Sequence, residues 1–526
     1  MIIVLFNKPE FEYDVHSLIK AFYPKEDVEM FYTCSEESVE GQNLACTHHE
    51  VGTELDRILE QADHVFRISY MEQTVSAAAD SSIPAQGQIE ISWQQKESFG
   101  LKTKQIECDL LNRALTKNKL KQTLYDLLTE GTGSKMPWGT LTGIRPTKIP
   151  MKLLEEGRTE KEIVSYMKET YLASDTKIEL AIEIAKRERK LLECIDYEEG
   201  YSLYIGIPFC PSTCLYCSFT SYPLSAWKKQ VDSYLDALEM EIDFTAQRFY
   251  HKKLNSIYIG GGTPTTLEPY QLDRLIRKIK CSFDLKDCVE FTVEAGRPDS
   301  ITEGKLAVLR KNGISRISIN PQTMKQATLD LIGRHHTVEQ TIESFHMARE
   351  LGFDNINMDL IIGLPDESID DVRHTMEVLT ELKPDNVTVH SLAIKRAARL
   401  TIFKDRYQDM QMLNTQEHMD LCEEYCRRMG LTPYYLYRQK GMAGNMENVG
   451  YASEGKAGVY NILIMEEKQT IVALGAGATT KQVLPELNSD GSHRIERAEN
   501  VKDVKNYLER VDEMIQRKQN LFRGVI

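Results

Sequence analysis

Short apolar runs rich in β-branched residues alternate with longer amphipathic stretches between residue 201 and about residue 392. The short runs are typical of buried strands, and the longer stretches, with an apolar residue at every third or fourth position, are typical of helices that cover a sheet. Regular alternation of the two predicts repeated βα units around a parallel sheet. The six expected strands cover residues 201–207, 255–259, 288–294, 314–319, 355–361 and 386–391. Six units of this kind make an incomplete barrel.

The pattern changes on both sides of this barrel, which we place at residues 199–400. Residues 1–130 predict an N-terminal α/β domain. Residues 131–198 begin with Gly, Pro and Ser and continue with apolar positions at helical spacing, which predicts a linker followed by helices. Residues 401–526 predict a C-terminal α+β domain that caps the barrel.

The same periodicities place elements outside the barrel. Strands are expected at residues 2–6, 65–70, 88–93, 432–437, 458–465 and 470–474. Helices are expected at residues 12–22, 101–130, 415–428 and 501–516.

Composition and charge narrow the class of protein. Of the 526 residues, 41% are hydrophobic and 27% are charged, as in soluble globular proteins. The net charge is -15, so the chain lacks the excess of Lys and Arg that sequence-independent binding to nucleic acid needs. Asn7 and Lys8 interrupt the first apolar run far short of a signal peptide or membrane span. With 11 cysteines and no secretory signal, we expect a cytoplasmic protein that inserts in no membrane and binds no nucleic acid.

Candidate chemistry begins directly after the first barrel strand, with Cys210, Cys214 and Cys217. Three thiolates on one short loop suit an iron–sulfur cubane, which would keep one iron open. A zinc site would need a fourth Cys or His at a second paired spacing, but the next cysteine is Cys281 and the next histidine is His251. Zinc and three simply buried cysteines remain the alternatives.

Further motifs follow the other predicted strands. They are Gly260 to Pro264, Glu294 to Pro298, Ser318 to Gln322, Arg334, and Asp359 to Pro365. In parallel βα architectures the chemistry sits in loops beyond the carboxyl ends of the strands, and these motifs lie there.

In this order and spacing, the cysteine loop and the later motifs resemble the radical S-adenosylmethionine superfamily. Within it they resemble the oxygen-independent coproporphyrinogen III oxidase (coproporphyrinogen dehydrogenase) family, in its HemZ-like branch, over roughly residues 200–480. The resemblance implies an α/β fold with an incomplete (β/α)6 barrel. It also implies a [4Fe-4S] cluster on the three cysteines and S-adenosyl-L-methionine on the open iron.

The resemblance also implies contacts to that cofactor. The loop of Gly261, Gly262 and Thr263 would meet the methionine amino group, and Arg334 would hold the methionine carboxylate. The further contacts implied are Tyr204, Tyr216, Glu294, Gln322, Asp359, Ile361 and Ser391.

The implied reaction starts with one electron from a flavodoxin- or ferredoxin-type donor. A 5'-deoxyadenosyl radical would then take hydrogen from the β-carbon of a propionate on coproporphyrinogen III, and two propionates would become vinyl groups in haem biosynthesis. A tetra-anionic tetrapyrrole calls for cations near the barrel mouth, and the candidates are Lys395, Arg396 and Arg399. A solvated basic turn is the alternative interpretation of these three.

Two other functions remain open. Phe219 stands where the decarboxylating branch has another cysteine and where the haem-chaperone branch also has Phe. That chaperone branch carries a His-Asn pair ahead of Tyr-Trp, and the corresponding place here is Gly444-Asn445 ahead of Val449-Gly450-Tyr451. A haem-binding chaperone-like protein is the first alternative, and a radical enzyme that methylates or opens a tetrapyrrole is the second.

Overall fold

The computed structural model describes residues 1–24, 26–33, 51–72, 86–96, 100–109, 112–143, 145–393, 395, 398–402, 410–439, 442–488 and 492–523. Contacts divide the chain into two compact units. The first is Met1–Ile144 with Glu156–Leu180, and the second is Arg145–Glu155 with Ala181–Ile526. The four-part division expected from the sequence stays a prediction.

The first unit contains a five-stranded sheet in the order β2-β1-β3-β4-β5. Its strands are β1 (Ile2–Phe6), β2 (Val28–Tyr32), β3 (His64–Glu72), β4 (Gln86–Gln95) and β5 (Leu101–Asp109). The strand β1 pairs in parallel with β2 and β3, whereas the pairs β3–β4 and β4–β5 are antiparallel. The helices of this unit are α1 (Glu12–Phe22), α2 (Val51–Gln61), α3 (Arg113–Thr132) and α5 (Glu160–Tyr171).

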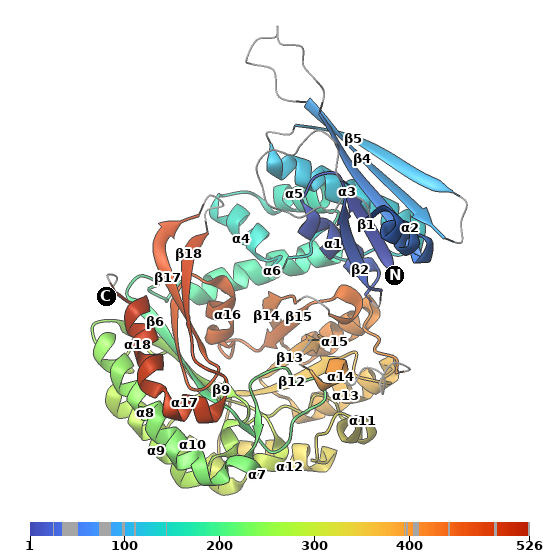
Figure 1. Cartoon of the computed structure of the whole chain (residues 1–526). Helices are drawn as coiled ribbons and strands as arrows, with labels where there is room; N and C mark the ends of the chain where they lie inside the picture. The colour runs from blue at the N-terminus through green and yellow to red at the C-terminus, as the bar shows by residue number, and fades with distance from the viewer. Residues whose placement is uncertain are drawn as a thin grey trace. The chain divides into compact units, whose positions relative to one another are not determined.

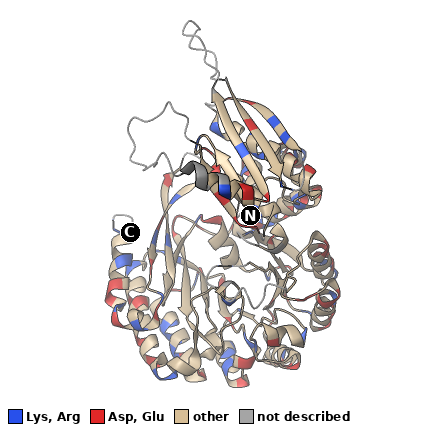
Figure 2. Ribbon diagram, turned by 45° about the vertical axis from the view of Figure 1, so that its right-hand side comes forward, with Lys and Arg blue, Asp and Glu red and all other residues tan. Residues whose placement is uncertain are grey.

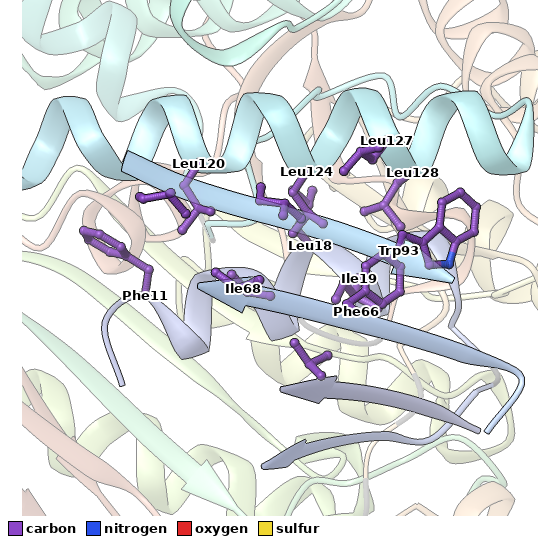
Figure 3. Packing of buried hydrophobic residues seen from close by; sticks show 14 of the residues in the cluster. Phe11, Leu18, Ile19, Phe66, Ile68, Trp93, Leu120, Leu124, Leu127 and Leu128 are labelled. Atoms are coloured by element: carbon purple, nitrogen blue, oxygen red, sulfur yellow. The ribbon is translucent and has the colours of Figure 1, made fainter. Parts of the chain in front are cut away.

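A hydrophobic core joins α1 and α3 to one face of this sheet (Figure 3). Leu18 of α1 and Leu124 of α3 are fully buried in it, together with Phe66 of β3. The rings of Phe66 and Trp93 stack with their centroids 5.6 Å apart. Burial of these apolar side chains favours folding by about 1.5–3 kcal/mol for each large residue.

The expected helix at residues 101–130 is wrong in its first third. Residues Leu101–Asp109 form β5, and the helix begins only at Arg113. Ile106 and Cys108 of this segment face the core, and the residue between them is exposed. Buried and exposed residues therefore alternate here, as they do along a strand. Nine residues of this segment pair with β4, which provides hydrogen-bond partners for its backbone N–H and C=O groups.

The second unit is built on an eleven-stranded sheet in the order β14-β15-β13-β12-β11-β10-β9-β6-β16-β17-β18 (Figure 1). Six neighbouring strands at its centre pair in parallel: β6 (Gly200–Ile207), β9 (Lys253–Gly261), β10 (Glu290–Glu294), β11 (Arg316–Ser318), β12 (Ile356–Ile362) and β13 (Asn386–Ser391). All six strands expected for the barrel are confirmed. Among the described residues, β6 pairs with β9 and β16 rather than with β13, so the barrel is incomplete, as expected.

Helices follow the parallel strands in turn and cover their outer side (Figure 1). They are α8 (Val231–Arg248), α9 (Pro269–Ser282), α10 (Glu303–Lys311), α12 (Val338–Glu350) and α13 (Ile369–Leu382). Capping boxes at Thr337 and Ser368 fix where α12 and α13 begin. Figure 2 shows charged residues on these outer helices, whereas the strands that they surround are mostly uncharged.

Further elements of the second unit connect and flank the barrel. Its other helices are α4 (Lys148–Glu155), α7 (Leu224–Trp227), α11 (Gln326–Leu331), α14 (Arg399–Ile402), α15 (Gln416–Arg428), α16 (Val459–Glu466), α17 (Val504–Glu509) and α18 (Val511–Leu521). The helix α6 (Asp175–Leu192) carries the chain from the first unit into the second. The other strands are β7 (Phe209–Cys210), β8 (Tyr222–Pro223), β14 (Thr432–Tyr437), β15 (Asn448–Ala452), β16 (Thr470–Leu474), β17 (Thr479–Leu487) and β18 (His493–Glu499).

Two expectations for the C-terminal part are wrong. Residues 458–465 were expected as a strand but belong to α16, which is capped by Glu467 in the left-handed conformation, with φ 51°. This short run is apolar apart from Asn461, and such a run has no periodicity that separates a buried strand from a buried helix. The expected single helix at 501–516 is two helices that meet at Arg510, which has φ -129°.

None of the described helices combines the length and the apolar character needed to cross a bilayer.

Candidate functional site

A cavity of about 260 Å³ lies at the carboxyl ends of the parallel strands. Its volume is close to the lower end of the range of about 300–1,000 Å³ that is usual for ligand pockets. The residues singled out in the sequence that line it are Cys210, Cys214, Tyr216, Cys217, Gly261, Gly262, Thr263, Glu294, Gln322, Arg334, Asp359, Ile361, Ser391 and Lys395. The fold therefore collects motifs that are up to 185 residues apart, from Cys210 to Lys395.

Two of the expected residues, Tyr204 and Arg399, are not on this wall. Tyr204 lies behind it on β6 and stacks on Tyr258 and Tyr460, with ring centroids 6.3 Å away from each. Arg399 donates from Nη1 to the backbone oxygen of Thr213 at 3.5 Å, beside the cysteine loop. Arg396 is outside the described residues.

The cysteine loop leaves β7 and turns back at Cys217, whose backbone N–H donates to the oxygen of Cys214. The Thr263 hydroxyl donates to Cys210 Sγ, and Arg297 Nη1 donates to Cys214 Sγ, both at 3.5 Å. Burial raises the pKa of the Cys210 thiol to about 11, and a bound metal would deprotonate such a thiol outright. Thiols in this setting are suited to hold a metal cluster.

The three thiols line the cavity but do not form a site for a single metal ion. Among the residues that the structure describes, no three His, Cys, Asp or Glu side chains converge as ligands of one metal ion would. A four-iron cluster does not require such convergence, because each thiolate binds a different iron.

The glycine loop after β9 approaches the cysteine loop so closely that side chains are excluded. A Cβ at Gly262 would lie 3.0 Å from Cys210 Sγ and 2.6 Å from the Phe209 oxygen. Gly261 has φ 107°, which L-residues rarely adopt. A bound group can therefore reach the backbone of this loop directly.

Arg334 links three walls of the cavity. Its Nη1 donates to the Tyr216 hydroxyl at 3.1 Å, and its Nη2 donates to the backbone oxygens of Gly296 and Asn320 at 2.9 and 2.8 Å. Its Nε is buried and has no partner among the described atoms. The same holds for the amide oxygen of Gln322, whose backbone has φ 70°. These orphaned donor and acceptor atoms fit a polar ligand that is bound beside them.

Two carboxyl groups, Glu294 at the end of β10 and Asp359 within β12, have pKa values that shift in opposite directions. Burial raises the pKa of Glu294 to about 7, although the Tyr258 hydroxyl donates to its Oε1 at 2.5 Å. Burial also acts to raise the pKa of Asp359, but His390, 3.8 Å away, and the 2.6 Å hydrogen bond from Asn357 outweigh it and leave that pKa below its usual value. Near neutral pH, Asp359 is thus charged while Glu294 titrates.

Ile361 and Ser391 complete the wall from inside the fold. Ile361 is in a buried cluster with Leu215 of the cysteine loop. The Ser391 hydroxyl donates to the Glu447 oxygen at 2.7 Å and accepts from Asn414 at 2.8 Å, so the side chain is already fully used. Its backbone carbonyl remains the group that a ligand could meet.

Sequence reasoning gave no role to several polar residues of the cavity wall. Among them are Arg297 and Asn320, which lie within recognised motifs, and His390, Tyr437, Gln439 and Asn448. Asn320 and His390 are at the ends of predicted strands, where their position was a usable signal. Tyr437 and Asn448 belong to the antiparallel strands β14 and β15, and no local pattern predicts that these join the barrel sheet beside β13.

Comparisons with known proteins found a family model, several relatives and a similar solved structure. A family model described as the radical SAM superfamily matches residues 204–379. HemZ of Bacillus subtilis, an oxygen-independent coproporphyrinogen-III oxidase-like protein, is 42% identical over 414 residues, which are 77% of this chain and 82% of HemZ. The heme chaperone HemW of the same organism is 39% identical over 198 residues, which are 37% of this chain and 51% of HemW. Among solved structures, coproporphyrinogen III oxidase (HemN) from Escherichia coli is 25% identical, with a TM-score of 0.48, and the match covers 62% of this chain and 73% of HemN.

The superfamily match identifies the cofactors as a [4Fe-4S] cluster and S-adenosylmethionine. The thiols of the cysteine loop, the side-chain-free glycine loop and the orphaned atoms of Arg334 and Gln322 fit these two groups. With 42% identity over most of both chains, the protein belongs to the radical SAM superfamily and, within it, to the HemZ family of oxygen-independent coproporphyrinogen-III oxidase-like proteins.

Proposed function

We propose that the protein catalyses the anaerobic oxidative decarboxylation of two propionates of coproporphyrinogen III, which gives protoporphyrinogen IX. The observation that carries this proposal is that one cavity is lined by the three cysteines, by all the expected cofactor contacts except Tyr204, and by the cationic side chain of Lys395. An anionic substrate would thus be bound beside the cofactors. The similarity to HemZ supports a tetrapyrrole as that substrate.

We propose that different residues of the cavity bind the cluster and the parts of S-adenosylmethionine. When bound, the cluster and S-adenosylmethionine supply a 5'-deoxyadenosyl radical. The three cysteines would hold the cluster, the loop from Gly261 to Thr263 would receive the methionine amino group, and Arg334 would receive the methionine carboxylate. Glu294 and Asp359 would accept hydrogen bonds from the ribose hydroxyls, and the unpartnered amide oxygen of Gln322 would accept a hydrogen bond from the same ligand.

The atoms and charges of each decarboxylation balance without an additional proton donor or acceptor. The β-carbon of a propionate would give a hydrogen atom to the deoxyadenosyl radical, and the propionate would then lose carbon dioxide and one electron and become a vinyl group. The electron that starts each cycle would come from a flavodoxin- or ferredoxin-type protein, and the electron released at the end would go to a one-electron acceptor.

Substrate binding would rest on cations and polar groups at the mouth of the cavity. Lys395 lines it directly, and burial lowers the pKa of this amine. His390 and Tyr437 are close neighbours there, with 3.4 Å between Nδ1 and the hydroxyl oxygen. A propionate carboxylate that replaces water at these groups would gain charge-assisted hydrogen bonds.

The test is anaerobic turnover of the cluster-loaded protein with a low-potential reductant, S-adenosylmethionine and coproporphyrinogen III, with 5'-deoxyadenosine and porphyrin mass followed together. The proposal predicts deoxyadenosine and the loss of two carboxyl groups. Deoxyadenosine without loss of carboxyl groups would contradict the substrate assignment.

A second candidate function is haem delivery, which two observations favour. The chain is similar to the heme chaperone HemW over 198 residues. Phe219, next to the cysteine loop, lines the cavity and is 75% exposed, so it offers an aromatic face to a flat macrocycle. Stable haem binding by a fully loaded protein that forms no deoxyadenosine would favour this function over the oxidase.

A further inference from the structure

Arg297 is the other arginine of the cavity wall, and its guanidinium is almost entirely buried, with 4% of the residue exposed. Asp299 binds it with both carboxylate oxygens, at 2.9 Å from Nε and 2.6 Å from Nη2. This fork leaves only Nη1 to face the cysteine loop. Because two parallel hydrogen bonds fix the plane of a guanidinium, the direction of Nη1 is fixed as well.

The remaining nitrogen of this guanidinium, Nη1, contacts the cysteine loop. Nη1 donates to Cys214 Sγ at 3.5 Å and to the backbone and hydroxyl oxygens of Ser212 at 3.2 and 3.1 Å. The Ser212 hydroxyl in turn donates to the Gly333 oxygen at 2.8 Å, beside Arg334. A single buried cation therefore both braces the loop and directs a hydrogen bond at one of the three candidate ligand sulfurs.

A hydrogen bond or a positive charge at a ligand sulfur favours the reduced cluster, because reduction adds one negative charge. The effect is large where water is excluded, and both Cys214 and Arg297 are buried. Asp299 weakens this effect of Arg297 on the cluster, because its carboxylate lies within hydrogen-bonding distance of the guanidinium and offsets the positive charge.

We propose that Arg297 is a positioning residue for the cluster, which sets its reduction potential through the hydrogen bond to Cys214, and that Asp299 limits the size of this effect. The proposal concerns the cofactor that the family shares, and it does not depend on which substrate the protein uses.

Two variants test the proposal by the direction of the change. Arg297→Gln removes the positive charge and shortens the side chain that donates to Cys214, so the cluster should become harder to reduce. Asp299→Asn keeps the cation and removes its counter-charge, so the cluster should become easier to reduce. We expect each to change the ratio of reduced to oxidised cluster at a fixed potential by about tenfold, which is about 59 mV for one electron.

The measurement is a redox titration of the reconstituted protein with a low-potential reductant, followed by the paramagnetic signal of the reduced cluster, with iron and sulfide counted for each variant. Arg274→Gln is the matched control. Arg274, on the outer helix α9, also binds two carboxylates, Glu239 and Asp236 at 2.7 and 2.6 Å, but both of these lie on the outer helix α8, and Arg274 is not in the cavity lining.

Opposite shifts in the two variants, with none in the control, support the proposal. Fully loaded variants with unchanged potentials, or with shifts in the same direction, overturn it. If Arg297→Gln does not load iron, Asp299→Asn decides alone: a more positive potential supports the proposal, and an unchanged one overturns it.

Discussion

Tyr216 and Arg334 connect the cysteine loop to the opposite side of the barrel through one hydrogen bond of 3.1 Å. Tyr216 directly precedes Cys217, and Arg334 also holds backbone oxygens that follow β10 and β11. The orientation of the guanidinium is therefore coupled to the loop that carries the cluster ligands. Cluster loading and cofactor binding are expected to depend on each other through this pair.

The first prediction concerns the affinity for S-adenosylmethionine. Arg334→Lys cannot keep three directed contacts and bind a carboxylate as well, so we expect a loss of about 1.5–3 kcal/mol in binding, which is about 10- to 150-fold in Kd. Anaerobic calorimetry on the cluster-loaded protein measures it. Tyr216→Phe is the matched control, because it removes one contact of the guanidinium and leaves the two backbone contacts, and its loss should be smaller. An affinity unchanged in Arg334→Lys would remove this residue from the cofactor site.

The second prediction concerns pH. The pKa of Glu294 is about 7 in the folded protein without cofactor, and its ordinary value is 4.5. Hydrogen bonds donated by a ribose favour the charged carboxylate, so affinity should rise by up to about tenfold per pH unit as the pH approaches 7 from below, and then level off. Glu294→Gln should remove this dependence between about pH 5 and pH 8. A slope that persists in the variant would assign the titration to another group.

The same shift has a consequence for the stability of the cofactor-free protein. Because the folded state binds the Glu294 proton more tightly than the unfolded state does, the contribution of this group is fully present below pH 4.5 and is lost as the pH rises through about 7. The free energy of unfolding of the wild type relative to Glu294→Gln should therefore fall over that window. Chemical denaturation at several pH values measures it, and an increase with pH would be the wrong sign.

The third prediction separates the cluster ligands from the other cysteines. Cys217→Ala removes one of the three thiolates and should lose most of the bound iron and its visible absorption. Cys281→Ala is the control, because Cys281 is exposed and lies outside the cavity lining. Equal iron content in the two variants would refute the assignment of the cysteine loop.

The fourth prediction concerns a buried ion pair far along the chain. Lys518 Nζ is 2.5 Å from Glu241 Oε1, and both side chains are almost completely buried. Glu241 Oε2 also accepts from the backbone N–H of Gly475, in the glycine-rich loop that packs on β6. Lys518→Met leaves the carboxylate buried without its cation and should cost about 3–5 kcal/mol in the free energy of unfolding.

Lys505→Met is the control for this pair. Lys505 is 3.9 Å from Glu509 at the surface, where an ion pair contributes about 0–1 kcal/mol. Urea unfolding of both variants should show a large loss in the first and little change in the second. Similar midpoints would mean that water or a shifted carboxylate compensates the loss inside the core.

The barrel was predictable because its elements are periodic and its motifs follow them. Each of the six parallel strands contains β-branched residues, and the motifs that begin at Gly260, Glu294 and Asp359 start within three of them and continue into the loops that follow. Two predictions elsewhere are wrong. The short, mostly apolar run of α16 has no period that separates a helix from a strand, and the edge strand β5 carries enough charge to resemble a helix. The barrel strands form where the nearby sequence favours them, whereas the structure of an element such as β5 is decided by its pairing with a strand elsewhere in the sheet.

The site also contains residues that short motifs predict and residues that only the tertiary fold brings to the cavity. The cysteines, the glycine loop and Arg334 were found because short motifs carry them, and the cavity brings them together. Tyr437 and Asn448 reach it only through antiparallel strands that join the sheet from residues 432–452. Arg297 was within a recognised motif, yet its contact with Cys214 depends on a loop 83 residues earlier. The roles of all these residues stay predictions.

The most direct test of the proposed function uses coproporphyrinogen III that carries deuterium at the β-carbons of its propionates, under anaerobic turnover conditions. The account predicts that deuterium appears in 5'-deoxyadenosine, with vinyl groups formed in step. Turnover that leaves the deuterium on the tetrapyrrole, or deoxyadenosine that gains only hydrogen from elsewhere, would contradict it.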